Sequence, residues 1–149
     1  MVHLRAMKEE DLAAVLAIAD SLASAPHWAI EAYTKAIEPG SVPQRIALVA
    51  EVDGGVAGFA VAQIVQGTAE LETICVEGLA QGKGLGRELL GELMIAAKAR
   101  DAEEMTLEVR ASNERAVALY KGMGFRERGR RRKYYQHPVD DAVVMGMEL

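Results

Sequence analysis

Cysteine is almost absent from this chain of 149 residues, because Cys75 is its only one. A single cysteine can build neither an internal disulfide framework nor a thiolate zinc site. The histidines, His3, His27 and His137, do not have the spacing of metal ligands. We therefore expect no metal site. Since Cys75 lies inside an apolar run, we expect a small buried side chain and not a nucleophile.

Long apolar runs are absent as well. The longest fall well short of the roughly 20 residues that span a bilayer, and residues 1–5 lack the basic and then apolar pattern of a signal peptide. The 22 acidic residues outnumber the 17 basic ones, which disfavours non-specific binding to nucleic acid. We expect a cytoplasmic protein, a monomer or weak dimer, with neither a nucleic-acid nor a membrane partner.

Positive charge is scarce outside one segment. Residues 126–133 hold six of the 17 basic side chains and one of the 22 acids, which leaves 11 basic and 21 acidic side chains elsewhere. Such a run is usually a solvated hairpin or loop. Two alternatives stay open, which are help in binding a cofactor phosphate and contact with an acidic partner.

The distribution of apolar residues predicts a mixed α/β fold in one domain over residues 1–149. Apolar side chains three and four positions apart predict helices, and runs rich in Val, Ile and Ala predict strands. The expected order is β-α-α-β-β-β-α-β-α-β, a mixed and mostly antiparallel central sheet flanked by helices. Strands are expected at 2–7, 46–52, 56–65, 71–76, 106–110 and 142–149. Helices are expected from residue 9 to a stop at Pro26, at 29–37, at 87–100, and from an N-cap at Asn113 to Gly122 or Gly124.

Two turns set the direction of the strands. Asp53-Gly54-Gly55 predicts a tight hairpin, because Asp-Gly tolerates positive φ angles. A second turn at Gly67-Thr68 gives three antiparallel strands in a row. The strands 71–76 and 106–110 should be parallel neighbours, because a helix connects them by a right-handed crossover.

A glycine-rich turn, Gln81 to Gly86, joins the strand 71–76 to the helix that follows. A turn that opens a helix exposes backbone N–H groups at the positive end of the helix dipole, so it predicts an anion site. It is not a Walker A loop, because Gly84 follows Lys83 where a hydroxyl residue is required. It is not a dinucleotide fingerprint either, because Arg87 stands at the third glycine position.

The surroundings of this turn resemble the GNAT acetyltransferase superfamily. Gln81-x-x-Gly84-x-Gly86, after an apolar strand, is similar to its acetyl-CoA signature. Residues 107–125 contain Leu-x-Val-x-x-x-Asn and then Ala-x-x-Leu-Tyr-x-x-x-Gly-Phe, which resembles its second signature. Residues 131–135 and 141–145 resemble the ending of the ribosomal-protein-alanine N-acetyltransferases within it. The resemblance implies a three-layer GNAT-like fold.

The same resemblance implies transfer of an acetyl group from acetyl-CoA to an amine, by direct attack in a ternary complex. The strand before the turn would pair with the pantetheine arm as an added strand does, and the turn would hold the pyrophosphate. Asn113 would lie near the pantetheine as well as capping its helix. The expected cofactor-binding residues are Ile74, Cys75, Val76, Gln81, Gly82, Lys83, Gly84, Leu85, Gly86, Arg87 and Asn113.

Three residues are candidates for moving protons. The resemblance implies that Tyr120 protonates the departing thiolate, although its position in an apolar stripe also fits a core tyrosine. Glu108 matches the proton acceptor of the ribosomal-protein-alanine type, and Glu72 matches where other GNAT enzymes keep theirs. Strict alternation would put Glu72 on the face of Ile74, unless a bulge reverses the strand. A surface carboxylate is the alternative for either glutamate.

The acceptor is the least determined part of the site. Trp28, Tyr134 and Tyr135 resemble residues of the subfamily's peptide groove, although His27 departs from its Pro-Trp pattern. The favoured acceptor is the N-terminal α-amine, with Ala first, of a protein such as a ribosomal protein. A small-molecule amine or amino acid is the main alternative, and a non-catalytic acyl-CoA-binding module is another.

Overall fold

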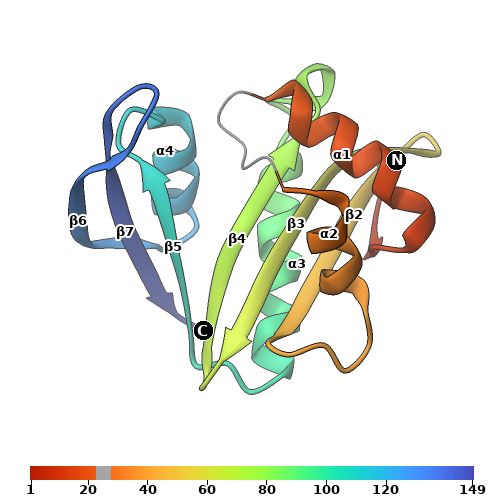
Figure 1. Ribbon diagram of the computed structural model, residues 1–149, viewed down its shortest axis with the longest axis horizontal. Coiled ribbons are helices and arrows are strands. Elements are labelled where there is room, and N and C mark those ends of the chain that lie inside the picture. The colour runs from red at the N-terminus through yellow and green to blue at the C-terminus, as the bar shows by residue number, and fades with distance from the viewer. Residues whose placement is uncertain (23–27) are drawn as a thin grey trace.

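The computed structural model describes residues 1–22 and 28–149, so Pro26 and His27 lie outside the described residues. In this part of the chain, one sheet contains the strands in the order β1-β2-β3-β4-β5-β7-β6 (Figure 1). The strands are β1 (Val2–Ala6), β2 (Gln44–Val52), β3 (Gly55–Val65), β4 (Thr68–Val76), β5 (Glu104–Arg110), β6 (Arg126–Tyr135) and β7 (Asp140–Glu148). The helices are α1 (Leu12–Ser21), α2 (Ile30–Ile37), α3 (Leu85–Ala99) and α4 (Glu114–Gly122), with 3-10 turns at Glu9–Asp11 and Gly78–Ala80.

The pairing confirms the mixed, mostly antiparallel sheet. Strands β2, β3 and β4 are antiparallel neighbours, and β4 pairs in parallel with β5. The hairpin turn between β2 and β3 has positive φ angles at Asp53 (51°) and Gly54 (84°), as its sequence predicts. The next turn is centred on Gln66 (49°) and Gly67 (79°), one residue earlier than expected. Strand β4 therefore begins at Thr68 and not at Leu71.

Strand β6 is missing from the expected order. Residues 126–133, expected to be a loop or a solvated hairpin, lie in an edge strand that pairs with β7. Nearly all of its side chains are exposed, so its sequence carries no alternation of apolar and polar residues. Backbone pairing with β7 makes it a strand.

The helices cover both faces of the sheet, with α1 and α2 on one face and α3 and α4 on the other (Figure 1). Each face has its own apolar cluster. The cluster with α3 and α4 includes Leu71, Leu89, Leu93, Met105, Tyr120 and Phe125. The cluster with α1 and α2 includes Val15, Tyr33, Val49, Phe59 and Cys75. None of the helices described is long and apolar enough to cross a membrane.

Two irregularities of β4 shape the functional region. First, β4 pairs with β5 only over Thr68–Glu70 and Glu104–Thr106, and beyond this the two strands diverge (Figure 1). Second, the β3–β4 register shifts so that Val61 faces Thr73 while Ala62 faces Leu71. Such a bulge adds a residue to one strand and reverses the alternation of its side chains.

The bulge corrects one expectation about faces. Glu72 pairs with Arg45 on β2. Ile46 packs into the cluster with α3 and α4, and neighbours on a strand face opposite sides of the sheet, so Arg45 faces α1 and α2. Glu72 lies on that face as well. Ile74 packs against the α3 cluster instead. Strict alternation would have put Glu72 on the face of Ile74, but the extra residue in β4 reverses the face, which is the alternative that the sequence left open.

Candidate active site

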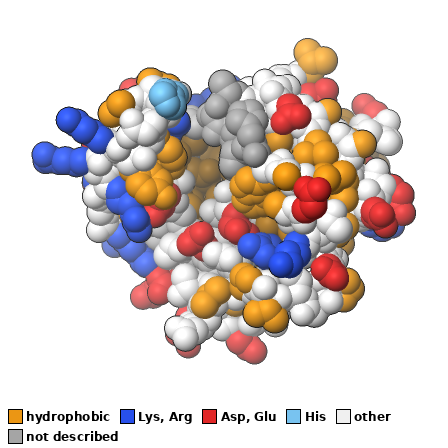
Figure 2. Space-filling model, viewed as in Figure 1, with side chains coloured by type: hydrophobic (Ala, Val, Ile, Leu, Met, Phe, Trp, Pro, Cys, Tyr) orange, Lys and Arg blue, Asp and Glu red, His pale blue; other side chains and the backbone are white. Residues whose placement is uncertain are grey.

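The divergence of β4 and β5 opens a cleft of about 1280 Å³, visible as a hollow between the two halves of the molecule (Figure 2). Single ligand pockets usually hold roughly 300–1000 Å³, so this cleft has room for two reactants. All the site residues expected from the sequence line it except Lys83. Lys83 instead lines a smaller pocket with Val52 and Leu79.

One end of the cleft is the glycine turn before α3. Gly84 is the N-cap of α3 at φ 80°, a left-handed conformation that favours glycine, and among the described residues no side chain caps the helix there. The first helical hydrogen bond is donated by the Glu88 N–H to the Gly84 carbonyl, at 3.1 Å. The N–H groups of residues 85–87 therefore have no partner within the helix, which is the donor arrangement that anions bind.

The free edge of β4 continues this end of the cleft. Beyond Glu70, β4 has no ladder partner on the β5 side within the described residues, so residues 73–76 present an unpaired strand edge to the cleft. The Gln81 side-chain amide donates to the Val76 carbonyl at 3.0 Å, which fixes the turn against the end of β4.

Helix α4 forms the opposite wall. Asn113 is its N-cap, as predicted, because the Asn113 side-chain oxygen accepts a hydrogen bond from the Ala116 N–H at 3.2 Å. Tyr120 lies on the same helix with only 6% of its surface exposed, and its ring packs edge-on against Phe125. Both Asn113 and Tyr120 also line the cleft.

The Tyr120 phenol is in a protonated state at neutral pH. Burial, and then the nearby Cys75 and Tyr135, raise its pKa to about 12. Cys75 lies on β4 and Tyr135 at the end of β6, so Tyr120 lies between the two halves of the cleft. A neutral phenol in this position can donate a proton or a hydrogen bond.

Beyond Tyr120 the cleft contains carboxylates, two of which are paired with arginines. An Oε1 atom of Glu108 lies 3.1 Å from Arg131 Nε, and Oε1 of Glu72 lies 2.9 Å from Arg45 Nε. The Glu72 side chain is the more enclosed, at 14% exposure against 31% for Glu108.

Glu70 is a third carboxylate in the cleft, and sequence reasoning missed it. Its pKa is raised, first by burial and then by the carboxylates of Glu72 and Glu108. No described residue forms an ion pair with it. The turn at Gly67 could have revealed Glu70. A strand that begins directly after that turn, as β4 does, includes Glu70.

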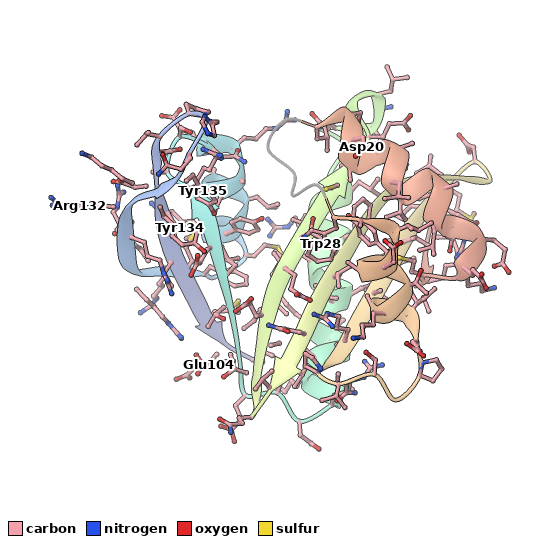
Figure 3. All side chains as sticks on the ribbon, in the orientation of Figure 1. Asp20, Trp28, Glu104, Arg132, Tyr134 and Tyr135 are labelled. Atoms are coloured by element: carbon pink, nitrogen blue, oxygen red, sulfur yellow. The ribbon has the colours of Figure 1, made fainter. Side chains whose placement is uncertain are left out.

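Aromatic residues line the cleft from both sides (Figure 3). Trp28 packs against the buried Tyr33, with ring centroids 5.1 Å apart. Tyr134 and Tyr135 pack edge to face at 5.2 Å. Arg110 lies over the ring of Tyr135, 4.4 Å from its centroid, and burial raises the pKa of Tyr135.

Together these features define a class of protein. An uncapped helix N-terminus, a free strand edge, a neutral phenol and several carboxylates in one cleft suit an acyltransferase with a phosphate-bearing acyl donor. Within residues 1–22 and 28–149, no group of three or more His, Cys, Asp or Glu side chains is arranged to hold a metal ion.

Comparison with known proteins identifies the family. The profile of the Acetyltransferase (GNAT) family matches residues 11–125. The chain belongs to this family, and it is an acetyl-CoA-dependent N-acetyltransferase. The resemblance of its motifs to GNAT signatures is thereby confirmed, and a non-catalytic binding module is not supported.

Several relatives act on ribosomal proteins according to their names. The ribosomal protein bS18-alanine N-acetyltransferase of Escherichia coli (strain K12) is 40% identical over 99 residues, 65% of this chain and 67% of that protein. A Bacillus subtilis (strain 168) protein, whose name gives the same activity provisionally, is 33% identical over 146 residues, 98% of this chain and 95% of that protein. The crystal structure of the Escherichia coli ribosomal-protein-S18-alanine N-acetyltransferase superposes with a TM-score of 0.88 at 31% identity, covering 99% of this chain and 94% of that one.

Proposed function

We propose that this enzyme acetylates the N-terminal α-amine of a protein, with Ala as the first residue, such as a ribosomal protein. The observation that carries the proposal is the extent of similarity to relatives named for this activity. One of them aligns over 98% of this chain, so the similarity includes both ends of the cleft. Trp28 and Tyr134 line opposite sides of the same cleft (Figure 3), where both could contact an acceptor peptide.

The residues of the cleft fit acetyl-CoA. The amides of residues 85–87 and the glycines before them would hold the pyrophosphate, and the free edge of β4 at Ile74 and Val76 would pair with the amides of the pantetheine arm. Arg87 lines the same end of the cleft and adds positive charge. Acetyl-CoA supplies a thioester whose acetyl carbon an amine can attack, with CoA leaving as a thiolate.

The chain's own groups would then move two protons. An α-amine has a pKa of about 7.7–8.0 and must be neutral to attack. Glu108 takes the amine proton, directly or through a water, with Glu72 and the newly found Glu70 as the other carboxylates within the same cleft. Tyr120 donates its phenolic proton to the leaving thiolate. Burial of Tyr120 keeps water from competing for that proton.

A peptide-library assay tests the proposal. The purified protein is incubated with acetyl-CoA and short peptides that differ only in the first residue, and the products are located by mass spectrometry. Acetylation of the α-amine, fastest for Ala-first peptides, is expected. Turnover of free amines or amino acids without turnover of any peptide N-terminus would contradict it.

A further inference from the structure

Helices α3 and α4 lie side by side with their N-terminal ends at the same end of the cleft. Three close approaches show their relative direction. A Cβ at Gly82 would lie 3.2 Å from Arg115, one at Gly86 would lie 3.6 Å from Leu119, and one at Gly91 would lie 4.0 Å from Met123. The two helices therefore run in the same direction, and the first turn of α4 lies beside the glycine turn that precedes α3.

The two helices differ in what binds the backbone N–H groups at their N-terminal ends. The Asn113 side chain caps α4, whereas α3 has only Gly84, which has no side chain to offer. The N–H groups of residues 85–87 therefore have neither a helical partner nor a side-chain cap, and the first turn of α4 is next to them. Arg115 extends from that first turn, and its Nη2 atom lies 3.2 Å from the position of a Cβ at Gly82. Arg115 and Gly82 both line the cleft.

The Arg115 guanidinium has no carboxylate of its own. Among the described residues it forms no ion pair, whereas Arg45 and Arg131 in the same region each pair with a glutamate. Glu114 precedes it on the helix, but neighbours in sequence do not face each other on a helix. A cation beside unpaired backbone donors leaves a site for an anion that the chain does not supply.

We propose that Arg115 is a cofactor-binding residue that contacts a phosphate of the CoA moiety from the α4 side. The proposal rests on the assignment of the glycine turn as the phosphate site in the proposed function. The α3 amides contact one side of the phosphate, and the Arg115 guanidinium closes the other side with charge-assisted hydrogen bonds. Nothing local in the sequence indicates this role, because it depends on α4 lying beside the glycine turn.

Binding measurements on Arg115→Ala test this role with three probes. Calorimetry gives the Kd of CoA and of dephospho-CoA, and an NMR titration gives the Kd of pantetheine, which has no phosphate. Arg115→Ala should raise the Kd of CoA about tenfold, which corresponds to about 1.4 kcal/mol, because a charge-assisted contact with the phosphate is removed. Arg115→Lys should have an intermediate effect, and the Kd of pantetheine should not change.

The probes also separate the two phosphate sources. A higher Kd for both CoA and dephospho-CoA assigns the contact to the pyrophosphate. A higher Kd for CoA alone assigns it to the 3′-phosphate. Arg132→Ala is the matched control, because Arg132 is exposed and points away from the cleft (Figure 3). Equal weakening of pantetheine binding, or no change with any probe, would overturn the proposal. A wild-type protein that binds CoA without acetylating peptides would instead contradict the proposed acceptor.

Discussion

Arg131 on β6 places its Nε atom 3.1 Å from a carboxylate oxygen of Glu108 on β5. The pair spans β7, which lies between the two strands in the sheet. On the other side of the cleft, Arg45 and Glu72 form the corresponding pair. Each carboxylate proposed to accept a proton is therefore held by an arginine from a neighbouring part of the sheet, and Glu70 is the carboxylate without such an ion-pair partner among the described residues.

Replacement of Glu108 tests the assignment of the base. Glu108→Gln should lower kcat by about 10²-fold or more, with the largest effect near neutral pH, because a positioned base contributes roughly 10²–10⁴-fold. Glu72→Gln and Glu70→Gln are matched controls, since each removes one carboxylate from the same cleft. Steady-state rates with an Ala-first peptide give the answer. A loss in Glu72→Gln or Glu70→Gln without a loss in Glu108→Gln would move the role of base to that residue.

Replacement of Tyr120 separates catalysis from packing. Tyr120→Phe keeps the ring and its contact with Phe125, and it removes only the hydroxyl. We expect kcat to fall by about 10²-fold while the Kd of acetyl-CoA changes by less than about threefold. The thermal midpoint of the variant serves as a control for folding. An unchanged kcat would mean that Tyr120 is only part of the apolar cluster.

The raised pKa of Tyr120 predicts the alkaline side of the pH profile. Burial raises this pKa to about 12, so the phenol keeps its proton at pH 10, whereas a phenol with the ordinary pKa of about 10 would be half ionised there. The kcat of the wild-type protein should therefore show no loss from tyrosine ionisation up to about pH 10.5. A decline centred near pH 10 that disappears in Tyr120→Phe would contradict this expectation.

Asp11 should make the stability of the N-terminal region depend on pH. Arg5 donates two hydrogen bonds to its carboxylate, at 2.7 and 2.9 Å, and lowers the pKa of Asp11 below the ordinary value of 3.8. A lowered pKa stabilises the fold at pH values above 3.8, and this stabilisation is lost as the pH falls through the folded-state value. Asp11→Asn should cost about 2 kcal/mol at pH 7 by urea unfolding, and less at pH 3.

Asp53→Asn is the control for that measurement. Asp53 is exposed and pairs only loosely with the N-terminal amine, at 3.6 Å, and Asn tolerates its positive φ angle as well as Asp does. This replacement should change the free energy of unfolding by less than about 0.5 kcal/mol. Equal costs for both variants at both pH values would mean that the Arg5–Asp11 pair contributes nothing specific.

Local signals explain which parts of the fold could be predicted. The Asp53-Gly54 turn and the Asn113 cap depend on the residues at those positions alone, and the structure contains both. Strand β6 could not be predicted from Arg126 to Lys133, because its backbone pairs with a distant strand and its side chains stay exposed. Tertiary pairing overrode a charge pattern typical of loops.

The site shows the same limit in finer detail. Nearly all of the residues that the motifs predicted line one cleft, because the strand, turn and helix that carry many of them follow each other in the chain. The side of the sheet on which Glu72 lies depends on a bulge, and the proximity of Arg115 to Gly82 depends on how two helices pack. Neither is determined by a short stretch of sequence, so the face of Glu72 and the position of Arg115 could be found only in the structure.

The rate of CoA release shows directly which amine this enzyme acetylates. The wild-type protein is given acetyl-CoA and one of two peptides, and the initial rate of CoA release is measured. The first peptide begins with a free Ala. The second has a blocked α-amine and carries an internal lysine as its only free amine. We predict rapid release and one acetyl group on the α-amine for the first peptide, and no release above background for the second. Equal rates for the two peptides, or release only with small free amines, would contradict the proposed function.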